Sequence, residues 1–309
     1  MRTPNSTTPN TDQDTPQGLF FAGGAYVLWG FLPLYMKLLS HIPVAEVIAH
    51  RVIWSVPIAA VVLILLGRTA TLREAFRNPR MLAMGCVTAA LISLNWGIYV
   101  YAIVTDRALD AAIGYYINPL FSVFLAAVLL RERLAGAQWV AVAIVSVAVL
   151  VLIVDAEETP WLAFGMMLTW GFYALAKKSL PIGPNQGFLM EVLLLLPPAL
   201  GYAIYMGATG GAKFLGGNSV DTWLLLGCGL VTAVPLLCYA NGAKLLRLST
   251  IGILQYIAPT MIMLNAVFIF GEPFGRARAI ALPLIWLALI IYTLSMVRQM
   301  RAKQALAQG

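Results

Sequence analysis

Long apolar blocks alternate with short polar connectors along almost the whole chain. A bilayer core is about 30 Å thick, so a helix needs about 20 mostly apolar residues to cross it. Blocks such as 140–154 and 280–291 are apolar almost without interruption, whereas the strands of a membrane barrel alternate in polarity over about 10 residues. The pattern therefore predicts an all-α integral membrane protein with ten transmembrane helices, at residues 18–38, 44–66, 82–104, 108–130, 136–154, 160–178, 186–206, 222–244, 249–270 and 276–297.

The composition excludes a water-soluble enzyme. Of the 309 residues, 61% are hydrophobic and only 11% are charged, whereas soluble domains carry about 25% charged residues. Cys86, Cys228 and Cys238 all fall inside apolar blocks and have no metal-binding or disulfide spacing, so we expect neither a metal site nor a cofactor. The net charge of +7 is not clustered as phosphate contacts require, and nucleic acid is not an expected partner.

Positive residues are divided unevenly between the two sides of the predicted helices. Fourteen of the 20 Lys and Arg residues fall on the side of both termini, five fall on the other side, and Arg51 lies within a span. Because cytoplasmic loops are enriched in Lys and Arg, both termini are expected in the cytoplasm. Residues 1–17 are polar and rich in Thr and Pro, which predicts a disordered cytoplasmic tail. Residues 298–309 are expected to form a second cytoplasmic tail.

The two halves of the chain resemble each other at a shift of about 140 residues. The matching segments are Tyr116–Pro119 with Tyr256–Pro259, and Trp29–Phe31 with Trp170–Phe172. Each half holds five predicted spans, and an odd number reverses the direction of the second copy. The sequence therefore predicts two inverted five-helix repeats, residues 18–154 and 160–297, a design that recurs in transporters.

Several of these segments also resemble a known family. Together with Tyr26–Pro33, Glu46–Arg51, Asn95–Tyr99 and Gly114–Pro119, they resemble the drug/metabolite transporter superfamily, most closely its EamA-type, RarD-like members. The resemblance covers the chain from residue 18 onward. It implies two EamA-like repeats around a central cavity lined mainly by the third, fourth, eighth and ninth spans, with access alternating between the membrane faces. It indicates much less about the substrate.

Polar and aromatic residues inside the predicted spans are candidates for a substrate-facing wall. On the fourth span, Tyr115 and Asn118 share one helical face, and Pro119 frees a backbone carbonyl one turn earlier. The other candidates for substrate contact are Trp29, Asn95, Tyr99, Tyr239 and Gln255. The alternative for this set is interhelical hydrogen bonding or core packing.

Ionisable residues within membrane spans are rare and are therefore functional candidates. Arg51 in the second span is expected to hold an anionic substrate or an inner carboxylate, or else to extend its side chain to the surface. His50 and Glu191 are candidates for coupling transport to protons, because each changes charge on protonation. Lys37 is expected to reach the surface or to pair with Glu46.

Together these features predict a secondary active transporter, with export favoured, for small amphipathic metabolites or drugs across the bacterial inner membrane. No glycine-rich phosphate loop with a Lys-Ser/Thr pair is present, so ATP is not the expected energy source. The alternatives are a facilitative metabolite or amino-acid permease without proton coupling and, less favoured, an integral membrane enzyme. An enzyme would need clustered His or carboxylate groups near one interface, and the chain has only His41 and His50. The expected partners are a small-molecule substrate, the lipid bilayer and, as candidate coupling ions, protons.

Overall fold

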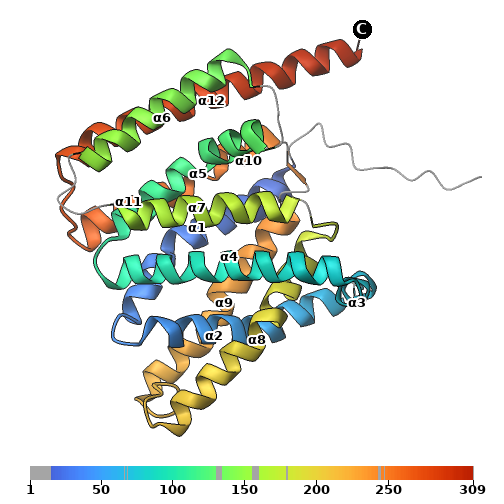
Figure 1. Cartoon of the computed structure of the whole chain (residues 1–309), viewed down its shortest axis with the longest axis vertical. Helices are drawn as coiled ribbons and strands as arrows, with labels where there is room; N and C mark the ends of the chain where they lie inside the picture. The colour runs from blue at the N-terminus through green and yellow to red at the C-terminus, as the bar shows by residue number, and fades with distance from the viewer. Residues whose placement is uncertain are drawn as a thin grey trace, which may run out of the picture.

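The described part of the chain is a bundle of long helices. The computed structural model describes residues 15–308, apart from residues 66, 68, 130–133, 155–159, 179, 243–244 and 247, and these residues contain helices and no strands (Figure 1). Eight helices within this part are long and apolar enough to cross a membrane. They are α1 (Pro16–Leu38), α2 (Val44–Leu65), α4 (Pro79–Val104), α5 (Ala108–Leu129), α6 (Gly136–Val154), α8 (Pro184–Ala208), α9 (Ser219–Gly242) and α12 (Arg276–Gln308). The all-α membrane class is confirmed, whereas only eight of the ten predicted spans meet this criterion.

The other two predicted spans differ from the rest. The block predicted at 160–178 forms α7 (Trp161–Lys178), a single helix of 18 residues whose last two residues are lysines. The block predicted at 249–270 is divided into α10 (Leu248–Leu254), α11 (Ile257–Leu264) and the π-helix η2 (Asn265–Ile269). The first division falls at Gln255 and Tyr256 because Pro259 has no N–H to donate to the Gln255 carbonyl one turn earlier. A continuous ninth helix was therefore a wrong prediction.

The outer surface of the bundle is strongly apolar. Phe20, Leu65, Val154, Trp223 and Phe268 are each more than 70% exposed, and they come from different helices. Apolar surface on this scale is unusual for a water-soluble monomer, whereas lipid chains solvate it. This surface and the spanning helices are those of a multi-pass membrane protein.

The connections between helices lie alternately at the two ends of the bundle (Figure 1). The end that carries the start of α1, the short helix α3 (Ala70–Arg77) and the end of α12 is called here the amino-terminal face. The other end, called the opposite face, carries the loops 39–43, 105–107, 209–218 and 270–275. The described part of the predicted tail 298–309 continues α12 as a helix to Gln308.

One close helix contact positions a residue of the candidate site. A Cβ atom added at Gly229 of α9 would lie 2.4 Å from the backbone of Trp54 in α2, so α2 and α9 approach each other only because this residue is glycine. One turn further along α9, Thr232 lies within hydrogen-bonding distance of Arg51 in α2. The absence of a side chain at Gly229 therefore permits the Arg51–Thr232 contact.

Candidate functional site

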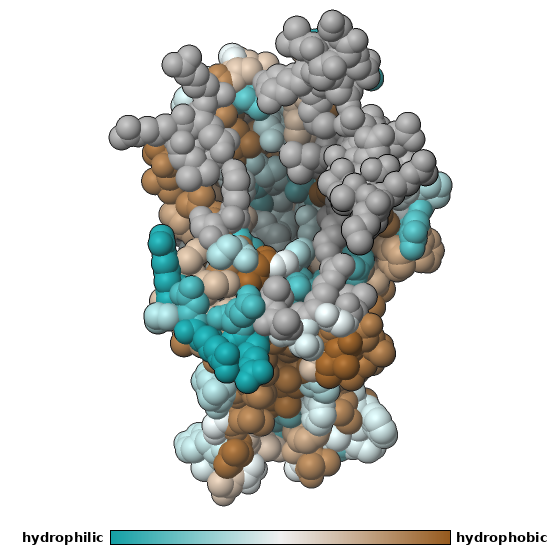
Figure 2. Space-filling view, turned by 90° about the vertical axis from the view of Figure 1, so that its right-hand side faces the viewer, coloured by the Kyte–Doolittle hydropathy of each residue, from teal (hydrophilic) through white to brown (hydrophobic). Residues whose placement is uncertain are grey.

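The amino-terminal face of the bundle is hollowed near its centre. Figure 2 looks onto this face and shows a depression whose visible depth is lined by moderately hydrophilic residues, whereas much of the flank is apolar. A depression lined in this way can admit water and a solute from one side of the membrane.

Aromatic residues from three helices form a continuous row in the bundle. The ring of Tyr99 in α4 lies 6.0 Å from that of Tyr115 in α5, and Tyr115 lies 6.1 Å from Trp170 in α7. Trp170 in turn lies 5.6 Å from Tyr173, one turn along the same helix. These centroid distances are those of favourable aromatic pairs. The row therefore brings the predicted site residues Tyr99 and Tyr115 together with Trp170 and Tyr173.

A second aromatic group joins α1 to α9. The Tyr239 ring lies 5.7 Å from both Tyr26 and Trp29, which are themselves 5.5 Å apart. Tyr239 also lies near Tyr173 of the first row. The predicted site residues Trp29 and Tyr239 are thus neighbours of each other and lie near the end of that row.

Arg51 is buried among neutral groups. Its side chain is 3% exposed, its Nε donates to the Thr232 hydroxyl at 3.0 Å, and its guanidinium lies 4.7 Å from the centre of the Trp96 ring. Tyr99 and Tyr115 lie close enough to interact with it electrostatically. Arg51 therefore does not extend to the surface, which was one of the sequence-based alternatives.

The three amide residues of the predicted site have different surroundings. Asn95 Nδ2 donates to the Thr169 hydroxyl at 2.9 Å and to the Met166 carbonyl at 3.2 Å, so this side chain ties α4 to α7. Asn118 is 4% exposed, and neither its Oδ1 nor its Nδ2 has a protein partner. Gln255 is partly buried at the division between α10 and α11. Asn95 thus has a structural role in this arrangement, whereas Asn118 keeps its hydrogen-bonding capacity unused.

The two candidate coupling residues lie in separate environments. Glu191 of α8 is 1% exposed, and its carboxylate accepts hydrogen bonds from Lys177 Nζ at 2.6 Å and the Tyr173 hydroxyl at 3.3 Å. His50 is 3% exposed, and its Nδ1 accepts a hydrogen bond from the Trp54 indole at 2.9 Å. Glu191 is therefore connected to the first aromatic row through Tyr173, whereas His50 lies against Phe214 in the loop 209–218, with ring centres 4.5 Å apart.

Beneath the opposite face, an apolar cluster closes the bundle. It includes residues from the ends of α1, α4, α5 and α9 and from η2. Its fully buried members include Leu39, Ile103, Leu109, Cys228 and Ala266. Because such clusters are close-packed, this end of the bundle does not admit a solute in the present arrangement.

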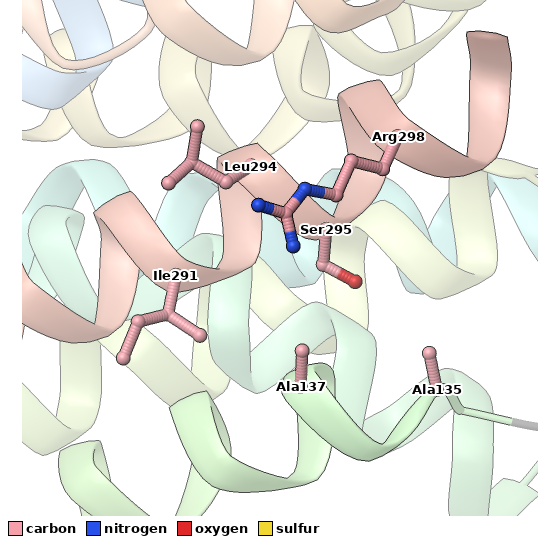
Figure 3. Close-up of a pocket in the computed structure, with 6 residues that line it drawn as sticks. All are labelled: Ala135, Ala137, Ile291, Leu294, Ser295 and Arg298. Carbon is pink, nitrogen blue, oxygen red and sulfur yellow. The ribbon is translucent and has the colours of Figure 1, made fainter.

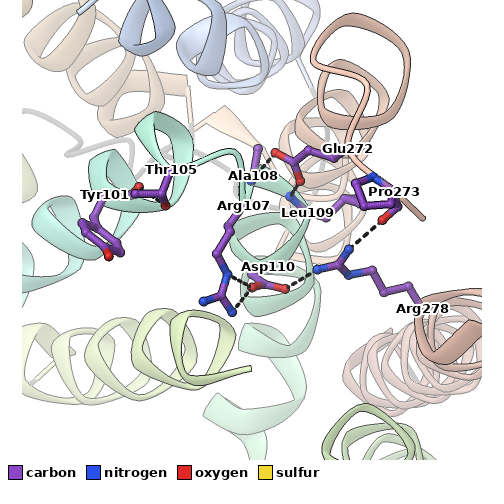
Figure 4. A network of polar contacts seen from close by, with 9 residues as sticks. All are labelled: Tyr101, Thr105, Arg107, Ala108, Leu109, Asp110, Glu272, Pro273 and Arg278. Atoms are coloured by element: carbon purple, nitrogen blue, oxygen red, sulfur yellow. Dashed lines mark hydrogen bonds and ion pairs between the residues drawn. The ribbon is translucent and has the colours of Figure 1, made fainter. Parts of the chain in front are cut away.

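Buried carboxylates tie the two halves of the chain together at the same face. Glu272 accepts hydrogen bonds from the backbone N–H groups of Ala108 at 2.6 Å and Leu109 at 2.9 Å, which begin α5 (Figure 4). Asp110 pairs with Arg107 of its own half at 2.7 Å and with Arg278 of the other half at 3.0 Å (Figure 4). Burial raises the pKa of Glu272 above its ordinary value, although the two N–H groups and Arg278 oppose this shift.

Two further contacts cross between the halves at this face. Glu46 of α2 accepts hydrogen bonds from the backbone N–H groups of Lys213 at 2.7 Å and Phe214 at 3.0 Å. His41 lies 2.9 Å from Asp221 at the start of α9. Lys37 pairs with Asp106, so the predicted Lys37–Glu46 pair is wrong, because Glu46 is occupied by the loop 209–218.

A groove of about 370 Å³ lies away from this site. It runs between the start of α6 and the middle of α12 and is lined by Ala135, Ala137, Ile291, Leu294, Ser295 and Arg298 (Figure 3). It contains none of the residues that the sequence predicted to contact substrate. We therefore do not assign it to the substrate path.

Sequence reasoning missed four residues that complete the site. Tyr173 and Lys177 are four residues apart, and this spacing places them on one face of α7 toward Glu191. Tyr26 precedes Trp29 by one turn in the same way. Thr232 had no such signal, because its contact with Arg51 depends on how α2 and α9 pack.

Comparison with known proteins agrees with this architecture. The EamA-like transporter family matches residues 16–154. The protein RarD of Streptomyces exfoliatus is 38% identical over 93% of this chain and 91% of its own length, and the uncharacterized transporter YojE of Bacillus subtilis is 37% identical over 94% and 98%. The protein RarD of Escherichia coli is 35% identical over 94% and 98%. One crystal structure shares the fold with a TM-score of 0.60 at 18% identity, over 90% of this chain and 97% of the other. The chain is therefore a membrane transporter that belongs to the EamA-like family of the drug/metabolite transporter superfamily, among its RarD-like members.

Proposed function

We propose that this transporter works by alternating access between two inverted five-helix repeats, residues 18–154 and 160–297. The counterparts would be α1 and α7, α2 and α8, α4 and α9, α5 and the α10–α11–η2 segment, and α6 and α12. If each helix is replaced by its counterpart, the pair α1–α9 becomes α7–α4 and the pair α5–α7 becomes α11–α1. The pairs α2–α8 and α6–α12 stay the same. In the structure, the two helices of each of these pairs are in contact. A two-fold axis in the membrane plane produces this pattern, which supports the repeat.

The observation that carries the proposal is the difference between the two ends of the bundle. A hollow opens on the amino-terminal face, whereas an apolar cluster and cross-half polar contacts close the opposite face. A transporter that exposes its site to one side at a time has one open and one closed end in each state. The present arrangement corresponds to the state open at the amino-terminal face.

The distribution of positive charge supports an orientation. The amino-terminal face carries the larger share of Lys and Arg, which supports a cytoplasmic location for this face by the positive-inside rule. The protein would then lie in the bacterial inner membrane with both termini cytoplasmic, and the open end would load solute from the cytoplasm. Export is the direction that this loading state favours.

The residues of the candidate site support small amphipathic metabolites or drugs as substrates. Aromatic rings offer apolar contact, while Asn118 and Tyr99 offer buried polar atoms that have no protein partner. Pockets for small molecules combine these two features. One relative, from Pseudomonas aeruginosa, is named chloramphenicol-sensitive protein RarD, so chloramphenicol belongs in the first panel of solutes.

Proton coupling is assigned to Glu191, with His50 as the second candidate. Protonation of Glu191 would remove its ion pair with Lys177 beside the aromatic row, and the row would then be free to move relative to α8. Facilitative transport without protons is the alternative, in which the Glu191–Lys177 pair stays intact through the cycle.

Transport by the purified protein in proteoliposomes tests the proposal. Counterflow of a labelled solute without nucleotide is expected for at least one amino acid, metabolite or drug of the panel. Asn118→Ala should slow counterflow, whereas Ser146→Ala, which removes a hydroxyl from the exposed side of α6, should not.

A pH gradient tests proton coupling in the same proteoliposomes. It should drive accumulation of the solute, and Glu191→Gln should abolish this effect. Absence of counterflow across a broad panel would contradict transport, and unchanged pH dependence in both Glu191→Gln and His50→Ala would contradict the coupling assignment.

A further inference from the structure

We infer that Arg51 anchors a carboxylate-binding site, so that the solutes of this transporter carry a carboxylate on a small, largely apolar body. This inference rests on the proposed transport function and names the class of substrate. The site consists of the Arg51 guanidinium, the Tyr99 hydroxyl and the aromatic side chains around them.

Arg51 is a buried cation that the protein neither neutralises nor exposes. It follows the first residue of α2 by seven positions, which is about 10 Å of helix, and it is 3% exposed. Its contacts with Thr232 and with the Trp96 ring are both to neutral groups. A charge at this depth is costly unless it is paired, and among the residues that the structure describes no carboxylate forms an ion pair with Arg51.

Two hydrogen-bond donors at this position have no acceptor. The Nη1 of Arg51 is buried without a partner, and so is the hydroxyl of Tyr99, which is 2% exposed and lies near Arg51. Buried donors are almost always satisfied. A carboxylate supplies a negative charge and two acceptor oxygens, and its match to a guanidinium is the strongest hydrogen-bonding geometry available to a side chain. An anion would satisfy both donors and would also neutralise the buried charge of Arg51, which a neutral polar group would not do.

The surroundings favour an organic anion over an inorganic one. The Tyr99 ring continues into Tyr115, Trp170 and Tyr173, with successive centroids 5.6–6.1 Å apart. These rings provide apolar contact along the direction that leads from Arg51 toward the Glu191–Lys177 pair. A bare inorganic ion would leave this row unused, whereas a carboxylate with an apolar or aromatic body would contact both parts of the site.

Binding measurements on pairs of acids and amides test this inference. The probes are phenylacetate with phenylacetamide, indoleacetate with indoleacetamide, hexanoate with hexanamide, and phenylalanine with phenylalaninamide. Affinity is measured on the purified full-length protein by ligand-induced stabilisation against heat and by tryptophan fluorescence, because Trp96 lies against the guanidinium. At least one acid should bind about 10- to 100-fold more tightly than its amide, as charge-assisted hydrogen bonds require.

Substitutions then assign the effect to Arg51. Arg51→Gln should remove the preference for the acid and leave binding of the amide unchanged, and Arg51→Lys should restore part of the preference. Tyr99→Phe, which removes one unpartnered hydroxyl and keeps the ring, should weaken the acid about 2- to 10-fold. Lys37→Gln is the matched control, because it removes a cation at the opposite face and outside the site. It should leave the preference for the acid intact. If Arg51→Gln does not fold, unchanged acid affinity in Tyr99→Phe overturns the inference.

The remaining outcomes separate the binding site from transport. If no acid of the panel binds more tightly than its amide, or if chloride alone stabilises the protein through Arg51, the site holds a fixed counter-ion or nothing and the inference is wrong. If proteoliposomes transport acids and amides equally and Arg51→Gln changes neither, the carboxylate site is wrong while transport stands. If acids bind through Arg51 but are not moved across the membrane, the site stands and the proposed transport function is wrong.

Discussion

The two faces of the bundle differ in how the halves of the chain are joined. At the opposite face, Glu46, Asp110 and Glu272 are each 5% exposed or less, and each bonds to a residue of the other half. At the amino-terminal face, the hydrogen bonds that join the two halves of the chain in the described residues run from Thr15 to the Leu245 carbonyl and involve neutral groups. Buried, hydrogen-bonded carboxylates therefore join the halves at the closed end, and they are the groups whose removal should open it.

Opening can be measured with a cysteine that the closed face covers. Cys228 is fully buried in the apolar cluster beneath the opposite face, whereas Cys86 is exposed and Cys238 is partly exposed. With Cys86 and Cys238 replaced by Ser, the rate at which a small thiol reagent labels Cys228 reports how often this face opens.

The largest effect is expected from Glu272→Ala. This change leaves the first two N–H groups of α5 without their acceptor, and loss of such a cap costs about 0.5–2 kcal/mol. Labelling of Cys228 should rise about 2- to 30-fold. Glu272→Gln retains one acceptor oxygen and should give a smaller increase. Equal labelling in Glu272→Ala and the parent protein would mean that this carboxylate does not hold the face closed.

A smaller effect should separate contacts between the halves from contacts within one half. Arg278→Gln removes the cross-half partner of Asp110, whereas Arg107→Gln removes the partner from the same half. Both changes break one partly buried ion pair, worth about 1 kcal/mol. Only Arg278→Gln should increase Cys228 labelling, by up to about 5-fold, while both should lower thermal stability slightly. An equal increase in both variants would show that Asp110 acts through local stability alone.

Acid should shift the same equilibrium through Glu272. Its pKa is raised in the closed arrangement by burial, with Asp110 adding to the shift and Arg278 opposing it, and it would return toward its ordinary value in water when the face opens. The closed state therefore binds the proton more tightly, so closure strengthens as pH falls through the raised pKa and weakens again above it. Cys228 labelling, corrected for the reactivity of the thiol with a free peptide, should fall in acid in the parent protein. Glu272→Gln should remove this component.

The smallest effect is expected at the exposed pair Lys37–Asp106. Both residues belong to the first half, and the Asp106 side chain is 64% exposed, so the pair contributes about 0–1 kcal/mol. Lys37→Ala should leave Cys228 labelling within 2-fold of the parent rate. A large increase would mean that exposed charges, and not only buried ones, keep this face closed.

The sequence predicts the spans well because hydrocarbon imposes a length and a polarity on each of them. It does not predict where a span breaks. Pro119 and Pro259 occupy matching positions, yet α5 continues through Pro119 whereas Pro259 divides the ninth span. The cost of a freed carbonyl depends on which neighbours satisfy it, and those neighbours come from other helices.

The candidate site shows the same limit. Helical spacing predicts that Tyr115 and Asn118 share a face, and the same reasoning could have added Tyr173 and Lys177. It could not place Thr232 against Arg51 or the loop 209–218 against Glu46, because those contacts join segments more than 160 residues apart in sequence. The prediction that Lys37 pairs with Glu46 was wrong for the same reason, because it relied on their proximity along the chain.

The bare backbone at Gly229 also limits how this protein can change. Any side chain there would act as a wedge between α2 and α9 and would pull the Thr232 hydroxyl away from Arg51. A side chain at this position would have to displace the backbone of Trp54, so α2 and α9 would move apart at a substantial cost in stability and the guanidinium would be less firmly oriented. Variants with a side chain at position 229 should therefore discriminate less well between charged and neutral substrates.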